Sequence, residues 1–127
     1  MEIVIAILFL ISPLDLIIAL TLLNVWLLRF NKKTIYRGRD ANSMKEEFTV
    51  YGLPLWFMYF IGFSKIILAV LLILGIWIYQ LNFYSYIILS ILMIGAIIMH
   101  FKVKDPIVKS VPAISVLTLL LALLGIL

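Results

Sequence analysis

The chain has 127 residues, of which 66% are hydrophobic and 13% are charged, with a formal net charge of +4. Soluble domains are about half apolar and a quarter charged, and small folds bury only part of their surface, so lipid must surround most of this chain. The chain contains no cysteine, which excludes disulfide chemistry, iron–sulfur ligation and thiolate catalysis. Nine of its ten basic residues lie in two loops between apolar segments, a pattern typical of membrane topology rather than of nucleic-acid binding.

Four apolar segments follow one another along the chain. They cover about residues 3–29, 54–79, 83–101 and 107–127. Each has about the 20 residues that an α-helix needs to cross a hydrocarbon core, and the strict alternation of β-strands is absent. The sequence therefore predicts an all-α protein: one domain, residues 1–127, forming an integral membrane bundle of four transmembrane helices.

The longest connection joins the first two segments. Ser43 and Glu46 have the spacing of a capping box, which predicts a short interfacial helix from Met44 to about Tyr51. A solvated basic loop is the alternative. The connection "YQLN" between the second and third segments is short and uncharged, and predicts a tight turn.

The positions of the basic residues predict the orientation in the cell membrane. The loops at 30–50 and 102–109 are basic, whereas the second connection and both termini have no lysine or arginine. The positive-inside rule places both basic loops in the cytoplasm and both termini outside. No cleavable signal peptide is recognised, so the first segment is expected in the mature, multi-pass protein. Aromatic residues are expected at the inner interface (Trp26, Phe30, Tyr51, Trp56) and at the outer one (Trp77, Tyr79, Phe83, Tyr84).

Two charged residues lie deep within the apolar segments. Lys65 is eleven residues beyond Pro54, about 16 Å from the inner boundary, and Asp15 is fourteen residues before Arg29, about 21 Å from it. A charge at mid-membrane costs a few kcal/mol unless it is paired, so we expect an Asp15–Lys65 ion pair between the first two helices. This pair is either a ligand-binding site or a structural clamp. Pro13 favours the site, because it loosens the helix beside Asp15.

The remaining candidate residues are weakly polar or small. His100, near the inner interface, is either a boundary residue satisfied by water or head groups, or a group that exchanges protons or contacts a ligand. A single histidine cannot supply both axial ligands of a haem, and no metal-ligating cluster or catalytic constellation is recognised. Helix packing is expected at the small residues Gly95, Ala96, Ser115 and Thr118.

Several of these motifs occur together in a recognisable order. Gly62 and Lys65 stand three residues apart, "LLILG" follows, then "LMIGAIIMH" with Gly95, Ala96 and His100, and finally "PAISVLTLLLALL" after a charged loop. From about residue 52 to residue 124 this pattern resembles the DoxX-like membrane proteins. The resemblance implies a compact four-helix bundle. It also implies an association with membrane redox complexes, such as thiosulfate:quinone oxidoreductase, or a chaperone role like that of related bundles in the endoplasmic reticulum.

Three functions follow as hypotheses. The first is an accessory protein that binds a quinone or lipid head group near Asp15, Lys65 and His100 and serves a membrane redox complex. The second is a chaperone or assembly partner for other transmembrane proteins, and the third, ranked below both, is an oligomeric transporter. No covalently bound cofactor and no independent catalysis are expected, since the chain offers no ligands for flavin, haem or metal. The expected partners are the bilayer and a membrane protein; homo-oligomerisation stays open.

Overall fold

The computed structural model of the chain describes residues 2–78 and 80–126, apart from the side chains of residues 4–12 and 126. The described residues contain no strand, so the all-α prediction is confirmed. In chain order the helices are α1 (Glu2–Leu23), the π-helix η1 (Asn24–Leu28), α2 (Met44–Tyr51), α3 (Leu55–Leu74), α4 (Gln80–Lys102), the 3-10 helix η2 (Ile107–Ser110) and α5 (Val111–Ile126).

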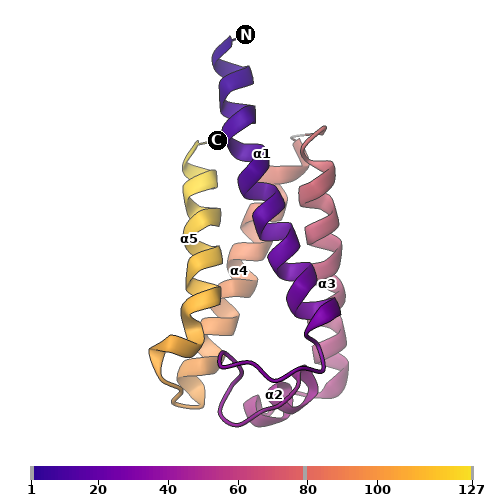
Figure 1. Cartoon of the computed structure of the whole chain (residues 1–127), viewed down its shortest axis with the longest axis vertical. Coiled ribbons are helices and arrows are strands. Elements are labelled where there is room, and N and C mark those ends of the chain that lie inside the picture. Colours follow the sequence, from indigo (N-terminus) through magenta and orange to yellow (C-terminus); the bar gives the residue numbers. More distant parts are fainter. Residues whose placement is uncertain (1, 79, 127) are drawn as a thin grey trace.

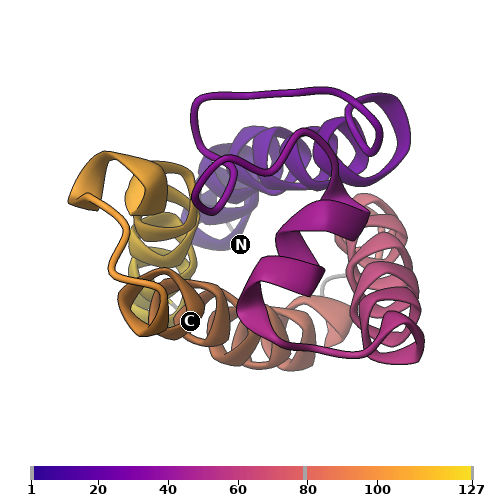
Figure 2. The same cartoon turned by 90° about the horizontal axis from the view of Figure 1, so that it is seen from below.

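The four long helices stand side by side in a ring. α1 packs against α3, α3 against α4, α4 against α5, and α5 contacts α1. The short helix α2 and the loop before it lie across one end of this ring (Figure 2), which we call the α2 end. α1 begins and α5 ends at the opposite end of the bundle (Figure 1).

Three helical segments are long and apolar enough to cross a membrane: Leu55–Leu74, Gln80–Lys102 and Ile107–Gly125. They correspond to the second, third and fourth predicted spans. In the first helix the described apolar stretch is Pro13–Leu28, which is shorter. Length and composition therefore support three of the four predicted spans.

The turn between α3 and α4 lies earlier than predicted. α3 ends at Leu74 rather than near residue 79, and α4 already begins at Gln80. Residues 79 and 127, at the predicted ends of two spans, lie outside the described residues. Residues 80–82 of the predicted turn are thus helical. Asn82 is buried against the α3–α4 turn: a Cβ on Gly75 would lie 1.7 Å from Asn82 Oδ1. Glycine at position 75 gives this side chain its space.

The first helix changes its hydrogen-bonding pattern before it ends. α1 continues through Pro13 and passes into η1, where the amide of Arg29 donates to the carbonyl of Asn24 over 2.9 Å. This bond spans five residues instead of four. Single π-turns of this kind occur frequently at functional sites.

Of the two alternatives for the first loop, a short helix or a solvated basic loop, the structure shows the helix, α2. Ser43 Oγ accepts a hydrogen bond from the amide of Glu46 over 3.2 Å, as the capping box predicts. The Glu46 carboxylate returns to the amide of Asn42 instead of that of Ser43. Gly52 ends the helix with a φ of 78°, a left-handed conformation that favours glycine.

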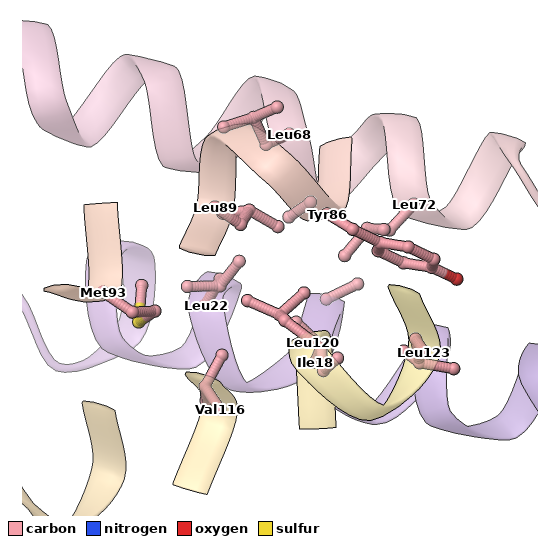
Figure 3. Packing of buried hydrophobic residues seen from close by; sticks show 12 residues of the cluster. Ile18, Leu22, Leu68, Leu72, Tyr86, Leu89, Met93, Val116, Leu120 and Leu123 are labelled. Atoms are coloured by element: carbon pink, nitrogen blue, oxygen red, sulfur yellow. The ribbon is translucent and has the colours of Figure 1, made fainter. Parts of the chain in front are cut away.

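The main apolar core lies between the four long helices (Figure 3). Because lipid tails are as apolar as these side chains, the core stabilises the bundle chiefly through van der Waals packing. A smaller cluster of Trp26, Met44, Phe48 and Met58 joins η1, α2 and α3 near the α2 end. The main core consists of Ile18, Ala19, Leu22, Leu68, Ala69, Leu72, Tyr86, Leu89, Met93, Val116, Leu120 and Leu123.

Candidate functional site

A cavity of about 880 Å³ lies between the helices in the half of the bundle next to α2. Its volume is within the range of roughly 300–1,000 Å³ that is common for small-molecule sites. Of the predicted site residues, Lys65, His100, Gly95 and Ala96 line this cavity, whereas Asp15 is not among its lining residues. The wall is mostly apolar, and its polar side chains are Thr21, Asn24, Arg29, Thr34, Tyr36, Arg37, Glu47, Tyr51, Lys65, His100 and Lys109.

Lys65 reaches the cavity from the middle of α3. Phe57, Ile61 and Lys65 follow one another at four-residue spacing, so they lie along one face of the helix, and all three line the cavity. The Lys65 ammonium lies 5.4 Å from the centroid of the Trp26 ring, a cation–π contact. Within the described part of the chain, the ion pairs join other residues and no hydrogen-bond acceptor contacts this ammonium.

Gly62 explains why Trp26 lies beside Lys65. A Cβ at position 62 would lie 2.8 Å from the six-membered ring of Trp26, closer than a side chain and a ring can approach. Glycine therefore lets the Trp26 ring rest directly on α3, one turn before Lys65. Trp26 is only 7% exposed, so it packs inside the bundle; its predicted depth at the inner interface stays a prediction.

A buried carboxylate organises the part of the cavity nearest to α2. Glu47 accepts hydrogen bonds from Arg37 Nη1 at 3.0 Å, from the amide of Gly38 at 3.1 Å and from the Tyr51 hydroxyl at 2.7 Å. Burial, together with the negative charge of Glu47, raises the pKa of Tyr51. The Tyr51 hydroxyl therefore stays protonated and donates to Glu47.

His100 continues this network from α4. Its Nδ1 lies 2.8 Å from Asp105 Oδ2, and both ring nitrogens lie 3.5 Å from the Tyr51 hydroxyl. Asp105 in turn accepts from the amide of Arg39 over 3.0 Å. His100 is thus buried and satisfied by protein groups, and it connects the cavity wall to the loop after α4. Its predicted role in proton exchange or ligand contact stays a prediction.

Asp15 is satisfied by α4 and not by Lys65. The Tyr86 hydroxyl donates to Asp15 Oδ1, and the Asn82 amide donates to Oδ2 over 3.2 Å. The carboxylate is fully buried. The described residues therefore contain no Asp15–Lys65 ion pair, and the predicted pairing is corrected.

The predicted pairing is wrong because the end of the first helix and the start of α3 do not lie at the same level along the bundle axis. The depth argument assumed a common boundary at Arg29 and Pro54. Because Trp26, eleven residues after Asp15, packs on Gly62, and Lys65 lies three residues nearer to the level of Asp15, the two residues are about 12 Å apart along the bundle axis. The chain between η1 and α3 runs past the end of the first helix, and α3 extends further toward the α2 end (Figure 1).

The small residues also differ from the prediction. A Cβ on Gly95 would meet no atom within 4 Å, so this glycine borders the cavity and is not a close helix contact. Ser115 and Thr118 on α5 are exposed, and Thr118 Oγ1 donates to the carbonyl of Ile114 over 2.8 Å. The buried face of α5 consists of larger residues, so these small side chains face away from the bundle.

Sequence reasoning did not single out five residues of these networks. Arg37 was noted only as one of the basic residues of the loop, and Glu47 only as part of the segment predicted to be a short interfacial helix or a solvated loop. Tyr51 was predicted as an interfacial aromatic and Asn82 as a turn residue, while Tyr86 was not singled out. One signal was present: Glu47 and Tyr51 stand four residues apart and share a face of α2. The partners of Arg37 and Asp15 depend on contacts between distant segments, which no local pattern indicates.

The comparison with protein families matches the chain over most of its length. The model of the DoxX-like family matches residues 34–124, which is more than half of the 127 residues. The chain belongs to the DoxX-like family. The match runs from the loop before α2 to the last turns of α5, so it includes every cavity residue except those of α1, η1 and Arg29. Comparisons with curated proteins and with solved structures gave no match.

The chemistry that this DoxX-like cavity offers is recognition of a polar group inside an apolar space. A free ammonium, a histidine and a buried Tyr–Glu pair can bind and orient such a group. Within the described part of the chain, no three histidine or carboxylate side chains gather in a group that would bind a metal ion.

Proposed function

We propose that this DoxX-like protein spans the membrane four times and binds a small amphipathic ligand, a quinone or a lipid head group, in the cavity. In this role it serves a membrane redox complex as an accessory protein, without catalysis of its own. The observation that carries the proposal is Lys65: an ammonium without an acceptor points into a mostly apolar cavity of about 880 Å³. An amphipathic ligand matches both features, since its head group supplies acceptors and its body fills the apolar space.

His100 is assigned a supporting role in this proposal. It lines the cavity and contacts Tyr51 on one side and Asp105 on the other. A histidine in this position can exchange a proton with a bound head group and pass it toward the α2 end. Lys65 and His100 are therefore the proposed ligand-contacting residues. Asp15 instead stabilises the contact between α1 and α4.

The α2 end is assigned to the cytoplasm. It contains the loops with nine basic residues, and both chain ends lie at the opposite end of the bundle (Figure 1), which agrees with the positive-inside rule. Because the chain has no cysteine, a single Lys33→Cys variant reports the side of this loop directly. A membrane-impermeant maleimide should label it in inside-out vesicles and not in intact cells.

Ligand binding is tested by filling the cavity. Gly95 and Gly125 are matched sites, because a Cβ at either position meets no atom within 4 Å, but only Gly95 lines the cavity. A ligand at 100 times its Kd stabilises a protein by about 2.7 kcal/mol. We expect decylubiquinone or hexadecyl phosphate to raise the Tm of the wild type and of Gly125→Leu, and not that of Gly95→Leu. An equal rise in Gly95→Leu would place the ligand elsewhere.

The exposed face of α5 favours assembly with another membrane protein as a second candidate function. Ser115, Thr118, Ala122 and Gly125 are all exposed and follow three- and four-residue spacing. Small residues in such a row let a second helix approach closely in lipid. The same two variants separate the functions: assembly predicts that Gly125→Leu, and not Gly95→Leu, prevents co-purification with the partner.

A further inference from the structure

The charges of the cavity wall are unbalanced. Its lining contains four basic side chains (Arg29, Arg37, Lys65 and Lys109) and one acidic side chain, Glu47. Glu47 already accepts from Arg37, from a backbone amide and from Tyr51, and among the described residues no hydrogen bond or ion pair joins it to Lys65, so its negative charge acts on that ammonium only at longer range. The cavity therefore has an excess of positive charge.

Most of these basic groups already have partners. Arg37 donates to Glu47 and to the carbonyls of Lys32, Arg29 and Phe30. The ammonium of Lys109 donates to the carbonyls of Arg37 and Arg39. Arg29 is exposed at the edge of the bundle. Lys65 differs from all of them, because within the described residues its ammonium makes no hydrogen bond or ion pair and contacts the face of the Trp26 ring at 5.4 Å.

The position of Lys65 makes this contact insufficient. The residue is ten residues into the 20-residue helix α3, so its Cα is about 15 Å from the start of the helix. An ammonium has three donors and no acceptor, and at such a depth it is costly without a counter-charge. The cation–π contact offsets part of this cost. A neutral ligand would add a dipole, whereas an oxyanion would supply both the charge and the acceptors.

We propose that the ligand of this cavity is an anionic amphiphile whose carboxylate or phosphate head group pairs with Lys65 while its apolar chain lies along the α4 and α5 wall. This inference rests on the proposed ligand site and specifies the class of ligand. It predicts that the cavity discriminates against neutral molecules of the same length. Quinones, which are neutral, then bind more weakly than the anions.

The test uses Trp26 as the reporter. Trp56 and Trp77 are 69% and 75% exposed and do not line the cavity, so Trp56→Phe/Trp77→Phe leaves Trp26 as the single tryptophan. The protein is placed in nanodiscs of zwitterionic lipid and titrated with palmitate, hexadecyl phosphate, hexadecanol and decylubiquinone. Concentrations are expressed per mole of lipid, after the partitioning of each probe into empty nanodiscs has been measured. Trp26 fluorescence then gives an apparent Kd for each probe.

We expect at least one anionic probe to bind about tenfold or more tightly than hexadecanol, a difference that a charge-assisted hydrogen bond can supply. Which anion binds more tightly distinguishes a carboxylate from a phosphate head group. In Lys65→Met the advantage of the anions should disappear, and in Lys65→Arg it should persist. Lys65→Met removes an unpaired charge from an apolar region, so its Tm without ligand should not fall below that of the wild type.

The experiment tests the ligand site and the anionic class of its ligand separately. If hexadecanol or decylubiquinone binds as tightly as the anions, or if Lys65→Met leaves the preference unchanged, the anionic class is wrong and the ligand site stands. If none of the four probes changes the fluorescence of Trp26 or the Tm, the ligand site itself is wrong, and the anionic class falls with it.

Discussion

At the scale of single residues, the two intramembrane charges differ in how they are satisfied. Asp15 accepts from Tyr86 and Asn82 and is fully buried. Lys65 contacts an aromatic ring and otherwise faces a cavity. A satisfied charge stabilises a helix contact, whereas an unsatisfied one is free to bind. The sequence shows that both are charged residues within apolar segments. Only their contacts in the structure distinguish a charge that stabilises a helix contact from one that is available to a ligand.

A double-mutant cycle tests this separation. Residues in contact have coupling energies of about 0.5–3 kcal/mol, whereas distant residues are additive within about 0.5 kcal/mol. We expect Asp15→Leu and Tyr86→Phe to be coupled, because each removes one side of the same hydrogen bond. Asp15→Leu and Lys65→Met should be additive. The free energy of unfolding in mixed micelles measures both cycles, and a coupling above about 1 kcal/mol between positions 15 and 65 would restore the ion pair.

The site residues that could be predicted from the sequence are those whose residue type is rare in apolar segments. Lys65 and His100 were identified because a charge and a histidine are rare in apolar segments, and both line the cavity. The partner of Lys65 was predicted wrongly, because residue counting gives an approximate depth and no rotation about the helix axis. Asn82 and Tyr86 were missed because such residues are ordinary near a membrane surface.

At the scale of elements, the four apolar segments and α2 could be predicted, since hydropathy and capping are local properties. The exact ends could not. α3 ends at Leu74 because the chain must turn where Asn82 packs against Gly75, which is a contact between two helices. The π-turn η1 likewise has no signature in the sequence. Its Trp26 packs on α3 only because position 62 is a glycine.

The glycine at position 62 gives a prediction for the α1–α3 contact. Replacing a helical glycine by alanine normally stabilises by up to about 1 kcal/mol through helix propensity. At Gly62 the new methyl group would lie 2.8 Å from the Trp26 ring, so Gly62→Ala should destabilise by about 1–3 kcal/mol. It should also shift the emission of Trp26.

Gly125→Ala is the matched control for this substitution. It has open space around the new Cβ, so it should leave the stability of the protein unchanged or raise it. Thermal unfolding and fluorescence measure both variants. Equal stability of Gly62→Ala and Gly125→Ala would show that Trp26 can leave α3 without cost.

At the scale of the whole molecule, the α2 end is assembled from segments that are far apart in the sequence. The loop before α2 contacts Glu47 on α2 through Arg37, and its carbonyls at 37 and 39 accept from Lys109 in η2, just before α5. His100 and Asp105 continue the network into α4 and the loop after it. α2 and the loop before it lie across this end of the bundle (Figure 2), and residues of both line the cavity. Changes in this network should therefore alter access to the cavity from the α2 end.

The buried Arg37–Glu47 pair is the centre of this assembly, and its loss should open the loop. The two side chains are 4% and 11% exposed, and removing one partner of a buried pair costs about 3 kcal/mol or more. In Glu47→Gln the amide cannot neutralise Arg37, so segment 29–43 should open locally more often. Trypsin cleaves only the open form. Lowering the free energy of opening by about 3 kcal/mol raises the population of that form roughly hundredfold, so cleavage after Arg37 or Arg39 should be roughly hundredfold faster.

The neighbouring glutamate provides the control. Glu46 is exposed, caps α2 and does not contact Arg37, so Glu46→Gln should change the cleavage rate by no more than about twofold. If the two variants are cleaved at the same rate, the carbonyl contacts of Lys109 are sufficient to fix the loop. If Glu47→Gln alone is cleaved faster and a bound ligand slows that cleavage, the ligand and the α2 end are energetically linked. Opening of this end would then be the step that admits the ligand to Lys65.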